Sequence, residues 1–250
     1  MKKIILRADD LGYSEAVNYG VAKSVLDGLI NNVGVMVNMP ATQHGVDLLN
    51  DADHVAFGLH TNISAGRPLT DPALIPSLVD EEGNFKASKL YRTAEVDFVD
   101  LDEVKIEIEA QYHRFLELFG RKPDYFEGHA VASDNFFKGL EEIAEKFDLK
   151  YSGMSHGRED ITIGQSKVRF YMDSMSGEYN PFSTLQRMVN EADDGVVSLM
   201  VCHPGYLDAY IMDNSSLQYP RVIEVEMLID PMTKEWLSGQ DVELVDYRGL

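Results

Sequence analysis

Short apolar runs alternate along the chain with longer segments in which apolar residues recur every three or four positions. The run Ile4–Leu6 predicts a buried strand, and Val17, Val21 and Val25 repeat at the spacing of one helix face. The elements expected after the first strand are a helix over residues 15–29, a strand over 33–37, a short helix over 42–50 and a strand over 55–58. This β-α-β-α-β order predicts a parallel sheet and an α/β fold.

A long excursion at about residues 64–100 interrupts this alternation, and Pro68, Pro72 and Pro76 mark its first half. Long loops over a strand end commonly carry substrate contacts. The elements expected beyond it are helices over 101–119, 140–147, 181–192 and 216–228, and strands at 125–126, 150–152, 168–171, 196–202 and 242–245. We find no internal repeat or linker, so a single barrel-like domain over residues 1–250 is predicted.

Composition narrows the class of protein. No run approaches the ~20 consecutive apolar residues needed to span a bilayer. The amino terminus enters the first strand directly, without the features of a signal peptide. Cys202 is the single cysteine, which excludes an intramolecular disulfide and favours a reducing compartment. We therefore expect a cytoplasmic protein.

The formal net charge of −20 bears on the partners. Nucleic acid rewards clustered lysine and arginine, so nucleic-acid binding is not expected, and neither is binding to an anionic membrane surface. A neutral or cationic small substrate is compatible with this charge. We also find no glycine-rich phosphate loop of either standard type.

Four predicted strands end in residues that can carry chemistry. His60, His129 and His203 each follow a strand, and Asp9 with Asp10 ends the first one. The carboxyl ends of parallel strands lie on one face, so these side chains are expected to converge. Two neutral imidazoles and a carboxylate, with positions open for water, make a hydrolytic divalent-metal site. The two neighbouring carboxylates can then divide their roles, one binding the metal and the other handling a proton.

The remaining candidates carry weaker signals. His156 and Arg158 lie in a polar loop and are candidate substrate contacts. Cys202 precedes His203, but the interior of a strand is a poor place for a nucleophile. No Gly-x-Ser-x-Gly elbow supports a serine triad. Three other histidines are expected to be surface or packing residues, namely His44, His54 and His113.

Several short motifs, taken together, resemble those of the YdjC-like carbohydrate deacetylases, which include the chitooligosaccharide deacetylases. The motifs are Arg7-Ala-Asp-Asp-Leu-Gly12, Gly58-Leu-His-Thr-Asn62 followed by Gly66-Arg-Pro-Leu69, Phe119-Gly-Arg-Lys-Pro123, and Cys202-His-Pro-Gly-Tyr206. The resemblance runs from the amino terminus to about Arg221. It implies a distorted (β/α) barrel related to the polysaccharide deacetylases.

The same resemblance implies the roles of single residues. A divalent ion would be held by Asp10, His60 and His129, with Asp9 as the carboxylate that handles the proton. Apart from the resemblance, we expect His203 or a partner to stabilise or protonate the leaving amine, and the candidate substrate contacts are Arg67, Arg158 and Tyr206. The metal, Mg²⁺ or Zn²⁺, stays open, and so does the oligomeric state, including a homodimer.

One motif departs from the family pattern. Where the family resembles Asp-Ser-His-His-His-Val-His, this chain reads Glu127-Gly-His-Ala-Val-Ala-Ser133. His129 is retained, whereas Val131 and Ser133 replace two further histidines. The departure bears on the identity of the substrate and on activity itself.

The leading hypothesis is therefore metal-dependent hydrolysis of an N-acetyl group on a small amino sugar or its oligomer. Phe85 and Tyr91 in the excursion are candidates for stacking on sugar rings, although packing is the commoner fate of such residues. One alternative is a sugar-binding or regulatory relative that has lost turnover. Another is a metal hydrolase that acts on a different ester or amide.

Overall fold

The computed structural model describes residues 1–129, 131–153 and 159–250. Its backbone falls into two compact units. The first comprises the described parts of residues 1–34, 40–57 and 155–250, and the second those of 35–39 and 58–154. The single domain over residues 1–250 stays a prediction, and each unit is described by itself.

The first unit is built on β1 (Lys2–Leu11), which is buried from Ile4 onward. β7 (Val196–Cys202) runs parallel to it, with Ala8 opposite Cys202. Further strands extend this sheet: β6 (Ser166–Tyr171) is parallel to β7, and β5 (Ile161–Ile163) is antiparallel to β6. β2 (Asn32–Val35, in this unit up to Gly34) and β8 (Val242–Leu244) both pair with β1. The almost continuous apolar runs of β1 and β7 suit strands whose two faces are both covered.

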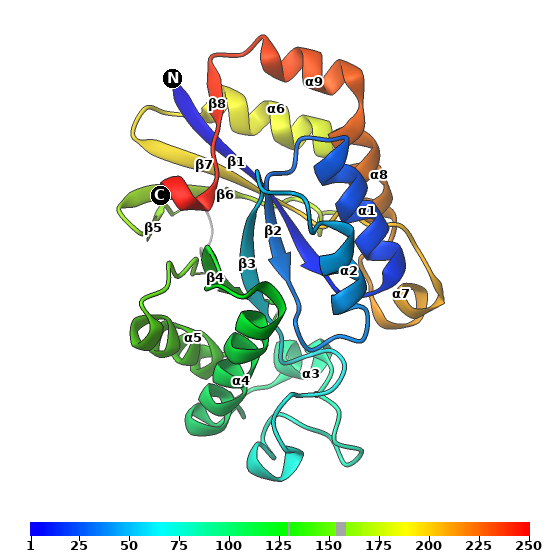
Figure 1. The fold of residues 1–250 in the computed structure, drawn as a ribbon, viewed down its shortest axis with the longest axis vertical. Helices are drawn as coiled ribbons and strands as arrows, with labels where there is room; N and C mark the ends of the chain where they lie inside the picture. The colour runs from blue at the N-terminus through cyan, green and yellow to red at the C-terminus, as the bar shows by residue number, and fades with distance from the viewer. Residues whose placement is uncertain (130, 154–158) are drawn as a thin grey trace. The chain divides into compact units, whose positions relative to one another are not determined.

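Helices pack on this sheet, and α1 (Glu15–Leu26) contacts both β1 and α8 (Tyr219–Ile229). Figure 1 shows α1 in blue beside α8 in orange. Val17 and Val21 of α1 are fully buried, as are Val225 and Leu228 of α8, and burial of each such side chain contributes ~1.5–3 kcal/mol. The other helices of this unit are α2 (Thr42–Leu48), α6 (Pro181–Glu191), α7 (Ala209–Asn214), α9 (Pro231–Ser238) and the 3-10 turn η2 (Tyr247–Gly249).

The second unit contains a parallel pair of strands, β3 (Ala56–Thr61, from Gly58 onward) and β4 (Tyr125–Gly128). Two long amphipathic helices, α4 (Leu101–Phe119) and α5 (Asp134–Phe147), lie side by side in it (Figure 1). Their buried faces supply Val104, Ile108, Phe115, Phe136 and Leu140 to the core. The excursion at 64–100 forms only the short η1 (Pro72–Leu74) and α3 (Ser88–Thr93).

The strands and helices alternate and most strand pairs are parallel, so the predicted α/β class is confirmed. Several predicted elements differ from the observed ones. The first helix ends at Leu26 and not at 29, because Gly28 turns the chain back against the backbone of Ser24. The helix predicted from 216 begins at Tyr219, because Pro220 must occupy the first turn. The strand expected at 150–152 is a single bridge between Tyr151 and Phe126.

The aromatic residues of the excursion are packing residues. Phe85 and Tyr91 are 5% and 3% exposed, and the Tyr91 hydroxyl donates to the carbonyl of Ile63 at 2.7 Å. Neither side chain is presented for stacking on a sugar ring, so that part of the hypothesis was wrong. The cause is that apolar residues such as Ile75 and Leu78, which are fully buried, give the excursion a core of its own.

Candidate functional site

In the first unit, β1 and β7 place Asp9, Asp10 and His203 at neighbouring strand ends, because Ala8 and Cys202 are register partners. Asp9 is 2% exposed and is held by Arg7 through two short contacts, Nη2 to Oδ2 at 2.8 Å and Nε to Oδ1 at 2.7 Å. This forked arginine–carboxylate pair fixes the direction of Asp9 and stabilises its ionised form.

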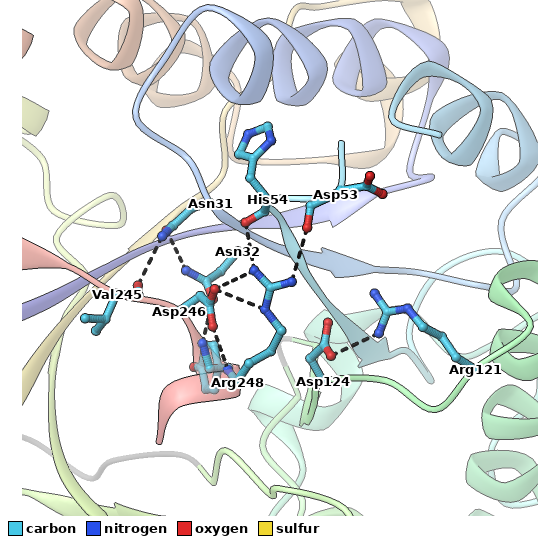
Figure 2. A network of polar contacts seen from close by, with 10 residues as sticks. Asn31, Asn32, Asp53, His54, Arg121, Asp124, Val245, Asp246 and Arg248 are labelled. Atoms are coloured by element: carbon cyan, nitrogen blue, oxygen red, sulfur yellow. Dashed lines mark hydrogen bonds and ion pairs between the residues drawn. The ribbon is translucent and has the colours of Figure 1, made fainter. Parts of the chain in front are cut away.

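The carboxyl-terminal residues of the first unit support this pair. Nη1 of Arg7 donates to the hydroxyl of Tyr247 at 3.0 Å, and Tyr247 is fully buried. Figure 2 shows how the backbone beside Tyr247 is secured: Arg248 pairs with Asp246 and donates to the carbonyl oxygens of residues 53 and 54. Residues more than two hundred positions apart thus combine to orient Asp9.

Asp10 lies in a sharp turn at the end of β1. Its φ of 75° is in the left-handed region, which aspartate tolerates better than most residues. Gly12 follows with a φ of 103°, and the amide of Tyr13 closes the turn on the carbonyl of Asp10 at 3.0 Å. Oδ2 of Asp10 accepts from Nη2 of Arg221 at 2.7 Å, and both side chains are almost completely buried. Burial and the charge of Asp10 raise the pKa of Tyr13 to about 12, so this phenol stays neutral.

His203 follows β7 directly. Its backbone amide donates to Oε2 of Glu224 at 2.5 Å, and the hydroxyl of Tyr179 donates to the other oxygen of Glu224 at 2.7 Å. Burial raises the pKa of Glu224 to about 7. Burial also raises the pKa of Cys202, which is completely enclosed. Both observations fit the expectation that this thiol is no nucleophile, because the thiolate is the reactive form.

The loop after His203 is pressed against α1. A Cβ added to Gly20 would lie 2.4 Å from the Cα of Gly205, so there is no room for a side chain at position 20. The amide of Tyr206 donates to the carbonyl of Ala16 at 3.1 Å, and that of Gly205 donates to the carbonyl of Arg221 at 3.3 Å. Tyr206, a candidate substrate contact, is thus half-buried beside the start of α1.

In the second unit, β3 and β4 bring His60, Glu127 and His129 together. His60 and Glu127 are register partners, and the amide of His129 donates to the carbonyl of Thr61 at 2.8 Å. Nδ1 of His60 contacts a carboxylate oxygen of Glu127. Nε2 of His60 and Nδ1 of His129 are 2.9 Å apart, with the two rings nearly perpendicular. If neutral His60 carries its proton on Nδ1 and donates a hydrogen bond to Glu127, its Nε2 has a lone pair that can bind a metal ion.

This arrangement fits a metal ion. Two nitrogens that bind one ion at ~2.0–2.1 Å lie roughly 2.9–3.4 Å from each other at the usual ligand angles, and the two imidazole nitrogens are 2.9 Å apart. A carboxylate behind a histidine ligand is a common way to fix its tautomer and ring direction. His60 and Glu127 are each 3% exposed, so this hydrogen-bonded pair is buried from solvent.

Arg67 and Asn62 of the second unit make hydrogen bonds within the excursion and at its start. The guanidinium of Arg67 donates to the carbonyl of Glu82 at 2.9 Å and to the side chain of Asn84 at 3.3 Å, which closes the loop of the excursion. Asn62, from the same motif as His60, accepts from the amides of Ser64 and Ala65 at 2.9 and 3.1 Å. Arg158, the third candidate substrate contact, lies outside the described residues.

Val131 and Ser133, two of the positions that depart from the family motif, are structural in this chain. Val131 is 3% exposed. Ser133 caps α5 by accepting from the amide of Phe136 at 3.1 Å, and its hydroxyl donates to Asp97 at 2.9 Å. Both residues therefore serve packing and capping, and neither offers a metal-binding side chain.

Four buried charged residues near these strand ends had no predicted role, namely Arg7, Glu127, Arg221 and Glu224. Glu127 carried a usable signal: it precedes His129 by two positions, so alternation along a strand places both on one face. Arg221 and Glu224 carried a weaker signal, because charged residues on a helix are usually exposed to solvent. Their partners are known only from the fold.

In the described part of the chain, no helix combines the length and apolarity needed to cross a bilayer.

The family model for YdjC-like proteins matches residues 3–239. A carbohydrate deacetylase 2 from Listeria innocua serovar 6a is 32% identical, over 99% of this chain and 98% of its own. A chitooligosaccharide deacetylase from Serratia marcescens is 30% identical, over 100% of this chain and 99% of its own. A crystal structure from Enterococcus faecalis V583, described provisionally as a cellobiose-phosphate cleavage protein, shares the fold, with a TM-score of 0.85, 23% identity and coverage of 99% and 98%. A CE4-family pseudoenzyme from Bacillus anthracis is more distant, with a TM-score of 0.50, 11% identity and coverage of 98% and 64%.

Proposed function

The chain belongs to the YdjC-like family, and on this basis we propose that it is a metal-dependent carbohydrate deacetylase that hydrolyses the N-acetyl group of a small amino sugar or its oligomer. The observation that carries the proposal is the histidine pair of the second unit, with its two nitrogens 2.9 Å apart and Glu127 behind His60. The names of full-length relatives supply the substrate class.

We propose Asp10, His60 and His129 as the ligands of one divalent ion. Two imidazoles suit Zn²⁺ and neighbouring transition metals better than Mg²⁺, which prefers oxygen ligands. When bound, such an ion polarises the amide carbonyl and makes water a stronger acid. Asp10 supplies the negative charge that the two neutral imidazoles lack.

We assign both proton transfers to residues of the first unit. Asp9 takes the proton of the attacking water, and its contact with Arg7 keeps the carboxylate ionised and aimed before the reaction. His203 gives a proton to the leaving nitrogen, because an amide anion is a very poor leaving group. Arg67, Arg158 and Tyr206 stay proposed contacts to the sugar. We also propose that the enzyme works in the cytoplasm, in keeping with its single buried cysteine.

The test is acetate release from acetylated mono- and disaccharides by metal-stripped protein, to which Mg²⁺, Zn²⁺, Mn²⁺ or Co²⁺ is then added. His129→Ala should lose both bound metal and turnover. His113→Ala is the matched control, since His113 lies in the same unit and its side chain is 57% exposed.

Wild-type zinc content in His129→Ala, by elemental analysis, would refute the ligand assignment. Metal binding without acetate release from any acetylated sugar would instead favour the sugar-binding relative, in which Val131 and Ser133 mark the loss of turnover.

A further inference from the structure

Helix α8 buries two charged side chains within one turn of each other. Arg221 is 2% exposed and Glu224 is completely buried. Taking a guanidinium or a carboxylate out of water is costly, and apolar residues of similar size would stabilise the helix packing at least as well. The contacts that the two side chains make therefore need a reason beyond packing.

Arg221 connects the proposed metal ligand to the neighbouring strand end. Nη2 donates to Asp10 at 2.7 Å, Nη1 to the carbonyl of His203 at 3.4 Å, and Nε to the carbonyl of Leu217 at 2.8 Å. The planar fork is thereby fixed by three acceptors from three segments. A carboxylate bound to such a fork cannot rotate freely, in contrast to one paired with the flexible ammonium group of lysine.

Glu224 acts on the other side of the same peptide segment. It accepts from the amide of His203 at 2.5 Å, while Tyr179 binds its second oxygen at 2.7 Å. The residue His203 is thus held at its N–H by Glu224 and at its carbonyl by Arg221. One turn of α8 sets the backbone from which the imidazole projects.

We propose that Arg221 and Glu224 are a positioning pair for the deacetylation reaction. Arg221 holds the carboxylate of Asp10 in its metal-binding direction, and Glu224 holds the backbone of His203. Neither residue touches the substrate. This inference rests on the proposed function, in which Asp10 is a ligand and His203 is the acid.

The first experiment measures zinc binding by calorimetry on metal-stripped protein. Arg221→Lys keeps the charge and loses the fork, so the apparent Kd for Zn²⁺ should rise about 10- to 100-fold. Arg187→Lys, whose arginine also pairs with an aspartate in the first unit at 2.5 Å, is the matched control and should leave the Kd unchanged. An unchanged Kd in a folded Arg221→Lys variant overturns the role of Arg221.

If Arg221→Lys does not fold, Arg221→Gln replaces it. Removing a positive charge beside a cation site would by itself tighten zinc binding, so weaker binding in this variant can be attributed to lost positioning. Tighter or unchanged binding overturns the proposal.

The second experiment concerns Glu224. Glu224→Gln keeps an acceptor for the amide of His203 and should preserve kcat within about threefold. Glu224→Leu removes the acceptor, so kcat should fall at least tenfold at unchanged KM and zinc content, and the amide of His203 should exchange faster with deuterium. Glu224→Asp, which withdraws the carboxylate by one methylene, takes the place of the leucine variant if that does not fold. Unchanged exchange and unchanged kcat would overturn the role of Glu224.

These readouts separate the two proposals. Zinc affinity and amide exchange do not depend on turnover, so they test the pair even if no acetylated sugar is hydrolysed. Conversely, acetate release by the wild type together with unaffected Arg221 and Glu224 variants would leave the deacetylase function standing and remove the positioning pair.

Discussion

Replacing Glu224 by glutamine should remove a pH dependence of stability that the native fold creates. Burial raises the pKa of this carboxyl from 4.5 to about 7. The folded protein therefore binds the proton more tightly than the unfolded chain, and the free energy of unfolding falls as pH rises from about 4.5 to about 7. Above that range both states are ionised and the loss is complete.

The size of the effect follows from the shift. A shift of one pKa unit corresponds to ~1.4 kcal/mol, so the whole loss is about 3 kcal/mol. Between pH 5.5 and 8, a range that keeps clear of the isoelectric point near 4.6, about 2 kcal/mol of it should be seen. For a chain of this length that is roughly 4–8 °C in Tm.

The measurement is thermal unfolding of the metal-stripped wild type and Glu224→Gln at pH 5.5 and pH 8. The change in Tm between the two pH values is then compared between the two proteins. The variant should gain roughly 4–8 °C relative to the wild type over this interval, because glutamine cannot ionise. Glu226→Gln on the exposed side of the same helix is the control and should follow the wild type. If the Tm of Glu224→Gln changes with pH in parallel with that of the wild type, burial does not raise the pKa of the Glu224 carboxyl.

Four further outcomes are expected. Asp9→Asn should retain zinc by elemental analysis and lose turnover by about 10²–10⁴, whereas Asp10→Asn should lose both; equal zinc loss in the two would show that their roles are divided wrongly. His203→Gln should keep zinc and KM while kcat falls, and loss of the metal would make it a ligand instead. Tyr247→Phe, which removes the acceptor for Arg7, should cost about 1 kcal/mol in chemical unfolding; no cost would mean that the hydrogen bond contributes nothing. Ser133→Ala should cost a similar ~1 kcal/mol through loss of the α5 cap, and an unchanged Tm would contradict that role.

The fold class could be predicted because it depends on local pattern. The apolar run before Asp9 and the repeat of Val17, Val21 and Val25 reflect burial along one strand and one helix face. The short helices could not be predicted from periodicity, because α7 and α9 have only six and eight residues. Their ends are set by caps such as Asp208 and Asp230, which resemble any other acidic residue in sequence.

The strand-end chemistry was partly accessible in the same way. A histidine or aspartate after an apolar run is visible in the sequence, so Asp9, Asp10 and His203 were named before their neighbours were known. Their supporting partners are not visible, because Arg221 follows Asp10 by 211 positions and Tyr247 follows Arg7 by 240. Such pairs depend on the register of β1 and β7 and on the placement of α8, which only tertiary packing determines.

The contact between Gly20 and Gly205 has a mechanical consequence for the first unit. Packed protein interiors have low compressibility and transmit strain, and here the backbone of α1 meets the backbone at Gly205 with no side chain between them that could change its rotamer. The helix that starts just after Asp10 and the loop that starts just after His203 must then shift together as one stiff body. Thermal fluctuation would preserve the spacing between these two groups, and any adjustment to sugars of different size would have to come from other segments of the chain.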